Sequence, residues 1–464
     1  MCAKRLYFFL APGLLASTSA ISLAVDPPVS PGSWTLVLIP DTQNYIADSV
    51  DAAIATKQTQ WIASRSGQRN IKFAVQVGDL VNNNNDTQWD RIRTTVEVID
   101  GVVPYALCTG NHDCGPSGNG DTRATQFPQA DRFGIGSPYA QQPTFRGYFQ
   151  HPNDPPGNTQ NSWHTFVAND CDFLVLTCEW GPRNAVVSWI EERVSAHPFH
   201  RVILVVHAYL ESSTARYNWS QSQSSMNPHA FGINNDPDRT NDGQDIWDKV
   251  ARKYQNVCLV CCGHSTRGYM KSRGDEGNDV HQMLYNTQDL PDGGQGWLRL
   301  LEFYPDDRTV RARTYSPHLD QSDTSAGDEF TFVLSPVATT DSDSDGLPDY
   351  YESRHQLNPN NASDAAADPD ADGASNKDEF LAATNPRDST SKLDVLGFEL
   401  LSNSSAQLRW RSVPGVAYDV ETSSDLTPDS WTASGSSTAS DWTSTLGLSA
   451  NEPRQFFRIV PQAP

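Results

Sequence analysis

The stretch of sequence that decides the fold is Val102-Val103-Pro104-Tyr105-Ala106-Leu107-Cys108-Thr109-Gly110-Asn111-His112-Asp113. Its apolar part is typical of a buried β-strand, and Gly110 permits a tight turn where that strand ends. A Gly-Asn pair alone indicates no more than a turn with an incidental histidine. An amide oxygen beside an imidazole at a strand end, however, also suits metal-assisted hydrolysis. The rest of the chain decides between these two interpretations.

Two earlier apolar runs also end in polar residues. Residues 34–40 lead to Asp41 and Gln43, and residues 72–77 lead to Gly78 and Asp79. Apolar residues at helical spacing over 52–66 and 87–99 separate the three runs. This alternation of strand and helix predicts an α/β fold, in which ligands bind where the strands end.

The pattern continues through the middle of the chain. Extended segments are predicted at 162–167, 172–177 and 201–206, and a helix at 185–197. His207 follows the third segment, and a helix at 246–254 leads to a strand at 257–262 that ends in Gly263-His264-Ser265-Thr266. The polar segments 115–160 and 211–242 are expected on the surface near the site. Further strands are expected up to about residue 336, at 297–303 and 309–314.

Collected in chain order, the polar residues at strand ends are Asp41, Gln43, Asp79, Asn111, His112, His207 and His264. Their order resembles the calcineurin-like metallophosphoesterase family, whose pattern is Asp-x-His, Gly-Asp, Gly-Asn-His-Asp/Glu, a strand-end His and Gly-His-x-His. The resemblance covers roughly residues 33–335 and implies a four-layer αββα sandwich. It also implies two divalent metals, drawn from Mn, Fe, Zn or Mg, and hydrolysis of a phosphomonoester or phosphodiester by a metal-activated water.

The resemblance also assigns residues to roles. Asp79 would bridge the two metals, and Asp41 would serve one of them. Asn111, His207 and His264 would complete the other metal site. His112 and Asp113 would be catalytic, with His112 as the general acid or the group that contacts the phosphate.

The sequence departs from the family pattern at Gln43 and Thr266, where the family has histidines in one and the same metal site. That site is expected to consist of Asp41, the Gln43 oxygen, Asp79 and water, with Thr266 as a further candidate. Oxygen donors weaken binding of Zn²⁺ or Fe and favour harder ions such as Mn²⁺, Mg²⁺ or Ca²⁺. The alternative is a mononuclear or inactive protein, which leaves a cell-surface binding protein of this fold as the competing function.

Acidic residues recur with a regular spacing after residue 340 and resemble EF-hand-like or thrombospondin type 3-like calcium repeats. Carboxylates at alternate residues converge on one ion, a glycine permits the turn, and a glutamate at the twelfth position closes the shell. The alternative, an acidic linker, does not need such regular spacing. The predicted calcium ligands are Asp341, Asp343, Asp345, Asp349 and Glu352 in the first loop, and Asp368, Asp370, Asp372, Asn376 and Glu379 in the second.

Short alternating strands with turns rich in Ser, Pro and Gly predict a small all-β sandwich at the end of the chain. We therefore predict a metallophosphoesterase domain at 25–338, a calcium-binding module at 339–391 and a β-sandwich at 392–464. The sandwich is an accessory module suited to attachment at a cell surface or matrix. A net charge of -22 argues against a nucleic-acid backbone as partner.

The first 24 residues combine Lys4 and Arg5, an apolar run and a small-residue end, which predicts a secretory signal peptide removed near Ala24. A membrane anchor is the alternative, but the run is shorter than the roughly twenty residues of a spanning helix. The mature protein is expected to be secreted, extracellular or periplasmic, with no transmembrane segment. Cys108 and Cys114 flank the central turn and are candidates for a disulfide. Cys258, Cys261 and Cys262 are expected to be buried structural residues rather than a zinc knuckle.

Overall fold

The computed structural model describes residues 26–462 except 27, 403 and 453. The predicted signal peptide, residues 1–24, lies outside these residues and stays a prediction. In the described part of the chain, no helix is both long and apolar enough to cross a bilayer.

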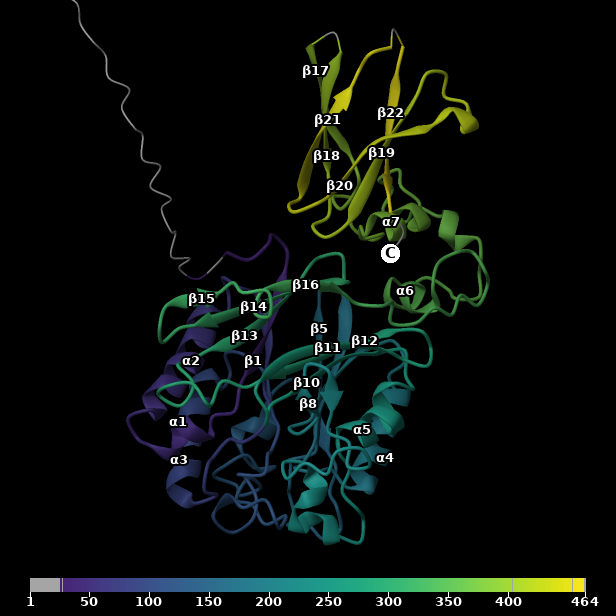
Figure 1. Ribbon diagram of the computed structural model, residues 1–464. Coiled ribbons are helices and arrows are strands. Elements are labelled where there is room, and N and C mark those ends of the chain that lie inside the picture. The colour runs from purple at the N-terminus through teal and green to yellow at the C-terminus, as the bar shows by residue number, and fades with distance from the viewer. Residues whose placement is uncertain (1–25, 27, 403, 453, 463–464) are drawn as a thin grey trace, which may run out of the picture.

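Two seven-stranded sheets build the large N-terminal part of the protein (Figure 1). The first sheet has the order β15-β14-β13-β1-β2-β3, with β16 beside β14. Its strands are β1 (Trp34–Ile39), β2 (Ile71–Gln76), β3 (Tyr105–Leu107), β13 (Leu298–Phe303), β14 (Thr309–Ser316), β15 (Gln321–Asp323) and β16 (Phe330–Val333).

The second sheet has the order β11-β12-β10-β7-β6-β5-β4. Its strands are β4 (Phe145–Tyr148), β5 (Ser162–Ala168), β6 (Cys171–Thr177), β7 (Arg201–Val205), β10 (Val257–Cys262), β11 (Arg267–Arg273) and β12 (Asp279–Tyr285). Strands β1, β2 and β3 are parallel, and so are β6, β7, β10 and β12. The carboxyl ends of each set therefore meet at one edge of their sheet.

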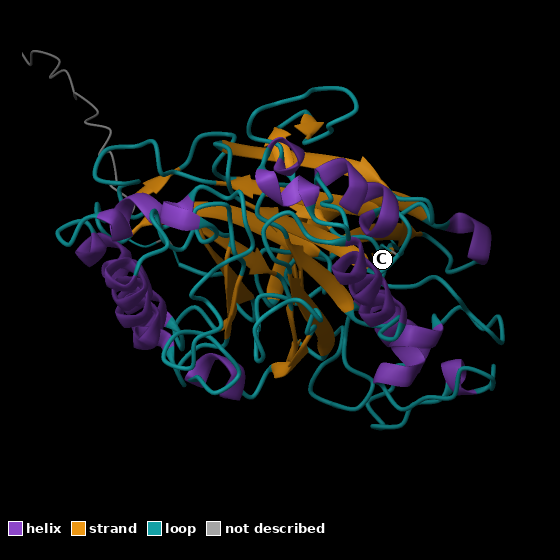
Figure 2. Cartoon of the chain, turned by 90° about the horizontal axis from the view of Figure 1, so that it is seen from below, coloured by secondary structure: helices purple, strands orange, loops and turns teal. Residues whose placement is uncertain are grey.

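The two sheets pack face to face, because alternate residues of β1 and β2 enter one buried cluster with residues of β5, β6, β7 and β10. Trp34 lies in this cluster, stacked on Phe303 at 4.1 Å and edge-on to Phe173 at 4.9 Å between ring centroids. The other faces are covered by helices. Figure 2 shows the strands in the middle and helices on both sides.

Helices α2 (Ala52–Arg65) and α3 (Asp86–Val96) share a buried cluster with the outer face of the first sheet. Helices α4 (Asn184–Ser195) and α5 (Gly243–Ile246) do the same for the second sheet. The short helix α1 (Gln43–Ala47) follows β1 directly. The predicted mixed α/β character of this part of the chain is confirmed.

Three local predictions were wrong. The helix predicted at 246–254 begins at Gly243 instead, where Asp242 forms a capping box, and continues as one π-helical stretch, Trp247–Ala251. The segment 115–160 is more than a surface excursion, because Phe127, Phe133 and Tyr139 are buried against Trp89 of α3 and its surroundings. No disulfide joins Cys108 to Cys114: in the described part of the chain both are buried free thiols.

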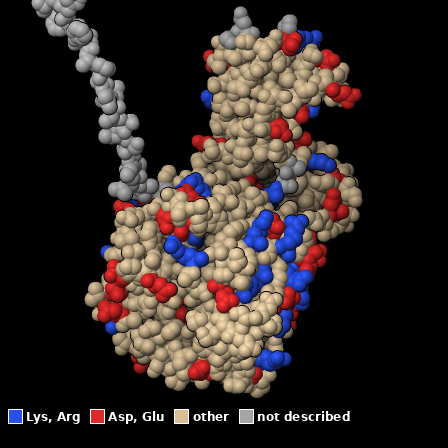
Figure 3. All heavy atoms as spheres, viewed as in Figure 1, with Lys and Arg blue, Asp and Glu red and all other residues tan. Residues whose placement is uncertain are grey.

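Surface charges of opposite sign lie beside one another (Figure 3). Lys271 and Arg273 on β11 both pair with Asp279 on β12, at 2.9 and 3.3 Å. Arg267 pairs with Asp328 at 3.0 Å. These three basic side chains of β11 thus have acidic partners.

The C-terminal part begins after β16 with two short helices, α6 (Asp349–Arg354) and α7 (Asn376–Ala382). Arg354 at the end of α6 contacts the N-terminal part, pairing with Asp307 at 2.6 Å. Two three-stranded sheets, β17-β18-β21 and β20-β19-β22, follow. Their strands are β17 (Val395–Ser402), β18 (Ser405–Arg411), β19 (Ala417–Ser423), β20 (Thr432–Thr438), β21 (Thr443–Ser449) and β22 (Phe456–Pro461), and residues of both sheets, including Trp410 and Tyr418, share one core.

Replacing Trp34 by Ala should lower the free energy of unfolding by about 3–5 kcal/mol, because the cavity would open between the two sheets. Urea unfolding monitored by circular dichroism measures the loss. Val167→Ala is the matched control, since Val167 is 60% exposed and its truncation should cost less than about 1 kcal/mol. Equal losses in the two variants would contradict the inter-sheet core.

Candidate metal centre

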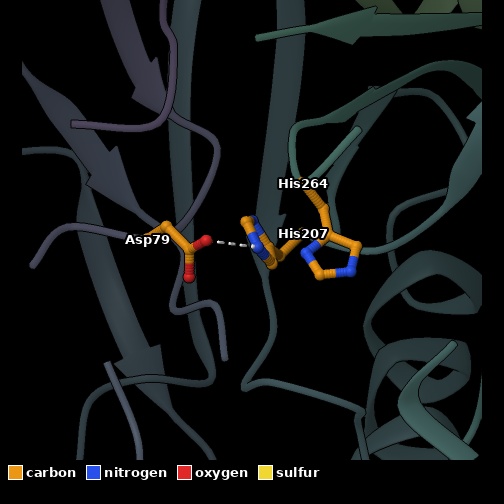
Figure 4. Close-up of side chains that lie close together, drawn as sticks. All are labelled: Asp79, His207 and His264. Atoms are coloured by element: carbon orange, nitrogen blue, oxygen red, sulfur yellow. Dashed lines mark ion pairs between the residues drawn. The ribbon is translucent and has the colours of Figure 1, made fainter. Parts of the chain in front are cut away.

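Five strand ends from the two sheets converge on one buried centre. Asp41 follows β1, Asp79 follows β2, and Asn111 and His112 follow β3. His207 and His264 follow β7 and β10 of the second sheet. Donor atoms of Asp79, His207 and His264 all lie within 4.8 Å of one another. Figure 4 shows the Asp79 carboxylate facing the His207 ring, with the His264 ring on the far side of His207.

Asp79 lies at the middle of the centre and comes from a strained turn, with φ of +52° after Gly78 at +109°. One carboxylate oxygen accepts the backbone N–H of His112 at 2.9 Å. The other lies 3.2 Å from Nε2 of His207. A side chain on Gly78 would meet the His207 ring at 2.2 Å, and one on Gly110 would meet the Asp79 carboxylate at 2.2 Å. Glycine at both positions lets the two loops approach the carboxylate and the imidazole.

His207 is oriented by the backbone of the opposite sheet. Its Nδ1 donates to the carbonyl of Val77 at 2.8 Å. In a neutral ring Nε2 then carries the lone pair and is an acceptor. It nevertheless faces the Asp79 carboxylate, which is also an acceptor, and the two groups form no hydrogen bond. Two buried acceptors at this distance need a cation between them, either a proton or a metal ion.

His264 is held in the same way by a distant segment. It lies in the left-handed region with φ of +70°, and its Nε2 donates to the carbonyl of Met226 at 2.8 Å. Nδ1 is therefore the ring nitrogen left for a metal. Trp180 packs against both imidazoles, with centroid distances of 5.9 Å to His207 and 5.4 Å to His264, and closes the centre with an apolar wall.

Asp41 is fully buried and lies beside His264. Its Oδ2 accepts the backbone N–H of His264 at 3.0 Å and the side-chain amide of Asn286 at 2.8 Å. Gln43 begins helix α1, and its Nε2 donates to the side-chain oxygen of Gln288. Sequence reasoning did not assign Asn286 or Gln288 to the site, because neither stands in a recognisable motif.

His112 is half-buried next to Asp79. Its Nδ1 donates to the carbonyl of Asn82 at 2.9 Å, which leaves Nε2 available to a substrate. Thr266, by contrast, is exposed, and its backbone carbonyl accepts the N–H of Asn286 at 2.9 Å.

Asp113 has a different role from the one we expected. Its Oδ1 accepts the N–H of Val81 at 2.9 Å, and its Oδ2 accepts those of Leu80 at 3.1 Å and Gly110 at 2.8 Å. A fully buried carboxylate with both oxygens committed to backbone amides cannot contact a substrate. Asp113 instead fastens the loop of Asp79 to the loop of Asn111, and we class it as a positioning residue.

Several buried acceptors of the centre have no hydrogen-bond partner among the described residues. They are Oδ1 of Asp41, Oε1 of Gln43, Oδ1 of Asn111 and Nε2 of His207. An unpaired buried acceptor costs about 1–3 kcal/mol, so native structures rarely keep four in one place. Nitrogen and oxygen donors of this kind are the ligands of divalent metals, and the residues present fit such ions.

Burial and close charges perturb the ionisable groups. Burial would raise the pKa of Asp79, but His207, His112 and His264 around it bring the pKa below its ordinary value. Burial, together with the Asp79 charge, raises the pKa of Asp41 well above the ordinary range. Burial would lower the pKa of His207, yet Asp79 and Asp41 raise it to about 9. The pKa of His264 falls to about 3 through burial and the neighbouring His207, so His264 is a neutral potential ligand.

The acidic repeats also place carboxylates together. Asp341, Asp343 and Asp345 form one group, and Asp368, Asp370 and Asp372 form another, each with oxygens within 4.8 Å of one another. Glu352 and Glu379 are fully buried, and both oxygens of Glu352 and one of Glu379 have no partner in the described part of the chain. Burial and the nearby aspartates raise the pKa of Glu352 to about 7 and that of Glu379 to about 8.

The first acidic loop differs from the prediction at two residues. Asp349 turns to Ser342, accepting its backbone N–H at 2.8 Å and its hydroxyl at 2.7 Å, so its carboxylate is already occupied. Asp364, which lies outside the twelve-residue pattern, joins Asp345 and Glu352 in one group. Local spacing could not reveal it, because it comes from the following segment. In the second loop Asn376 keeps a free buried oxygen while its amide donates to the carbonyl of Asp364 at 2.7 Å.

Comparison with known proteins gives distant likenesses. No protein-family model matches the chain. The uncharacterized protein YvnB of Bacillus subtilis (strain 168) is 28% identical over 312 residues, which are 65% of this chain and 21% of that protein. The chain thus spans about a fifth of the length of this curated relative.

Among solved structures, purple acid phosphatase PPD1 from yellow lupin is 16% identical with a TM-score of 0.40, over 66% of this chain and 55% of that one. GAP50, the anchor in the inner membrane complex of Plasmodium, is 13% identical with a TM-score of 0.36, over 71% and 93%. The NAD nucleotidase of Haemophilus influenzae is 8% identical with a TM-score of 0.34, over 65% and 50%.

Replacing Asp113 by Ala should lower the free energy of unfolding by at least about 3 kcal/mol, because three buried backbone N–H groups lose their acceptor. Chemical unfolding measures the effect. The matched control is Asp131→Ala, whose carboxylate is 72% exposed and should change stability by less than about 0.5 kcal/mol. A stable Asp113→Ala protein would show that the carboxylate does not hold these loops.

Proposed function

We propose that residues 25–338 form a metallophosphoesterase domain of the four-layer αββα type that hydrolyses a phosphomonoester or phosphodiester outside the cytoplasm. The observation that carries the proposal is the set of unpaired buried acceptors around Asp79, drawn from strand ends of both sheets. Asp79, Asn111, His207 and His264 would hold one metal, and Asp41, Gln43 and Asp79 the other. Export rests on the sequence of the first 24 residues.

Bound divalent ions supply an acidified water and neutralise charge on the phosphate oxygens. The residues of the chain do the rest. The N–H of His112 holds one oxygen of Asp79 in place. The carbonyl of Asn82 fixes the His112 ring, so that a protonated His112 can offer its Nε2 proton to the leaving oxygen of the ester. Trp180 and the buried walls around it keep the centre at low dielectric, which strengthens these interactions.

The competing proposal is a binding protein that keeps the fold and has little or no activity. The observations that favour it are the amide at Gln43 and the hydroxyl at Thr266, which stand where the resemblance implies two imidazoles in the second metal site. The two proposals differ in one measurable property, which is turnover of a phosphate ester.

We further propose that the two acidic loops bind Ca²⁺. Glu352 and Glu379 support this, because each is fully buried near aspartates and keeps at least one oxygen without a partner among the described residues. A buried carboxylate cluster of this kind is stable when a cation neutralises it. The ligands would be Asp341, Asp343, Asp345, Glu352 and Asp364 in the first loop, and Asp368, Asp370, Asp372, Asn376 and Glu379 in the second.

The phosphoesterase proposal predicts that the protein hydrolyses p-nitrophenyl phosphate or bis-p-nitrophenyl phosphate with added Mn²⁺. Asp79→Asn should lower kcat/KM at least about a hundredfold, because it weakens both metal positions, and His112→Ala should lower kcat by about 10²–10⁴-fold. His200→Ala, a half-buried histidine outside the centre, is the control and should keep wild-type activity. Equal rates in all four proteins would refute the proposed enzyme, and an inactive wild type that binds metal would favour the binding protein.

The calcium proposal predicts two bound Ca²⁺ ions per chain in equilibrium dialysis with micromolar Ca²⁺ and excess Mg²⁺. Glu352→Gln should lose one ion, because the buried amide cannot supply the closing charge. Glu399→Gln, on the exposed surface of β17, should keep both. Retention of both ions by Glu352→Gln would contradict the assignment of that residue.

A further inference from the structure

We propose that the two metal positions differ in chemistry: one is a mixed nitrogen and oxygen site, and the other is an all-oxygen site built by a chain of side-chain amides. The inference rests on the proposed metal binding. It assigns a borderline ion such as Zn²⁺ or Fe²⁺ to the first position and a hard ion such as Mg²⁺ or Mn²⁺ to the second. Asn286 and Gln288 are the positioning residues of the second site.

The nitrogen donors come from one sheet only. Both imidazoles, His207 and His264, come from strand ends of the second sheet. Asp41 and Gln43 both follow β1 in the first sheet and offer only oxygen. Asp79 touches both groups: its carboxylate lies within 4.8 Å of donor atoms of both imidazoles, and its backbone carbonyl accepts the N–H of Thr42, between Asp41 and Gln43, at 3.0 Å.

A chain of amides runs behind the oxygen donors. The side-chain amide of Asn286 donates to Oδ2 of Asp41 at 2.8 Å. The side-chain oxygen of Asn286 accepts the N–H of Gln288 at 2.9 Å. The side-chain oxygen of Gln288 in turn accepts Nε2 of Gln43, and its backbone carbonyl accepts the amide of Asn44 at 2.9 Å.

This chain determines which atoms stay free. Because Asn286 and the N–H of His264 occupy Oδ2 of Asp41, Oδ1 is the oxygen without a partner. Because Gln288 takes the NH₂ group of Gln43, the amide must present its oxygen, and Oε1 is likewise unpartnered and buried. The amide chain thus orients two oxygen acceptors, one on Asp41 and one on Gln43.

Position 266, which the same segment contacts, supplies no imidazole to this site either. The N–H of Asn286 binds the carbonyl of Thr266 at 2.9 Å, and the Thr266 side chain is exposed. Threonine at this position offers a hydroxyl oxygen and no ring nitrogen. Carboxylate and amide oxygens suit Mg²⁺ and Mn²⁺, whereas imidazole suits Zn²⁺ and Fe²⁺.

The test is metal analysis of chelator-stripped protein after dialysis against Zn²⁺ and Mn²⁺ together, read by inductively coupled plasma mass spectrometry. Wild type should retain one tight Zn²⁺ and hold one Mn²⁺ that exchanges readily. Gln288→Ala should weaken that Mn²⁺ by about tenfold or more and leave the Zn²⁺ in place, as loss of an outer-shell partner does. Mn²⁺ bound by the acidic loops is common to all variants and cancels in the comparison.

Three further variants sharpen the result. Gln288→Glu keeps the oxygen that accepts from Gln43 and should retain the Mn²⁺, whereas a purely structural role would not be rescued in this way. Gln43→His should take up a second Zn²⁺ in place of Mn²⁺. Gln141→Ala, at an exposed glutamine far from the amide chain, should bind metals like wild type.

The outcomes separate this inference from the proposed function. Two Zn²⁺ ions held with equal affinity by wild type, or unchanged Mn²⁺ affinity in Gln288→Ala, would overturn the all-oxygen site and leave the phosphoesterase proposal standing. No metal at the centre, shown by an Asp79→Asn protein that binds the same ions as wild type, would overturn both.

Discussion

The approach of Asp79 to His207 across the two sheets is the interaction on which the centre depends. It joins the end of β2 to the end of β7. Oδ2 of Asp79 and Nε2 of His207 lie 3.2 Å apart, and both side chains are fully buried. Neither group can be satisfied by water there, so each must be neutralised by the other or by a cation. The positive φ of Asp79 and the glycines at 78 and 110 are what bring the two loops this close.

The histidines of the centre are all oriented in the same way. Three histidines each give one ring nitrogen to a backbone carbonyl from a segment remote in sequence: His112 to Asn82, His207 to Val77, and His264 to Met226. The hydrogen bond fixes the tautomer and the ring plane, and the second nitrogen is left for chemistry. The polar segment 211–242 thus contributes to the centre through the Met226 carbonyl, without contributing a ligand of its own.

The sequence was sufficient to locate the polar residues of the candidate centre, because each stands where an apolar run ends. Asp41, Asp79, Asn111, His207 and His264 were found in this way, and the structure brings them together. The sequence could not separate donors from supports. Asp113 stands within the Gly-Asn-His-Asp block, and its position there suggested a catalytic role. In the structure its carboxylate accepts three backbone N–H groups instead. Asn286, Gln288 and Asp364 act through contacts that no local pattern encodes, such as the bond from Asn286 to Asp41, which spans 245 residues.

The residues at the proposed second metal position follow a physical logic of their own. An imidazole at position 43 would offer nitrogen and would need a carbonyl behind it, as the other three histidines have. Gln43 instead needs an acceptor for its NH₂ group, and Gln288 provides one. The residue at position 43 and the residue that orients it therefore depend on each other. Without Gln288, the Gln43 amide could turn its NH₂ group toward the centre and repel a cation. The amide chain from Asp41 to Gln288 is the counterpart, for oxygen ligands, of the carbonyls that orient the imidazoles.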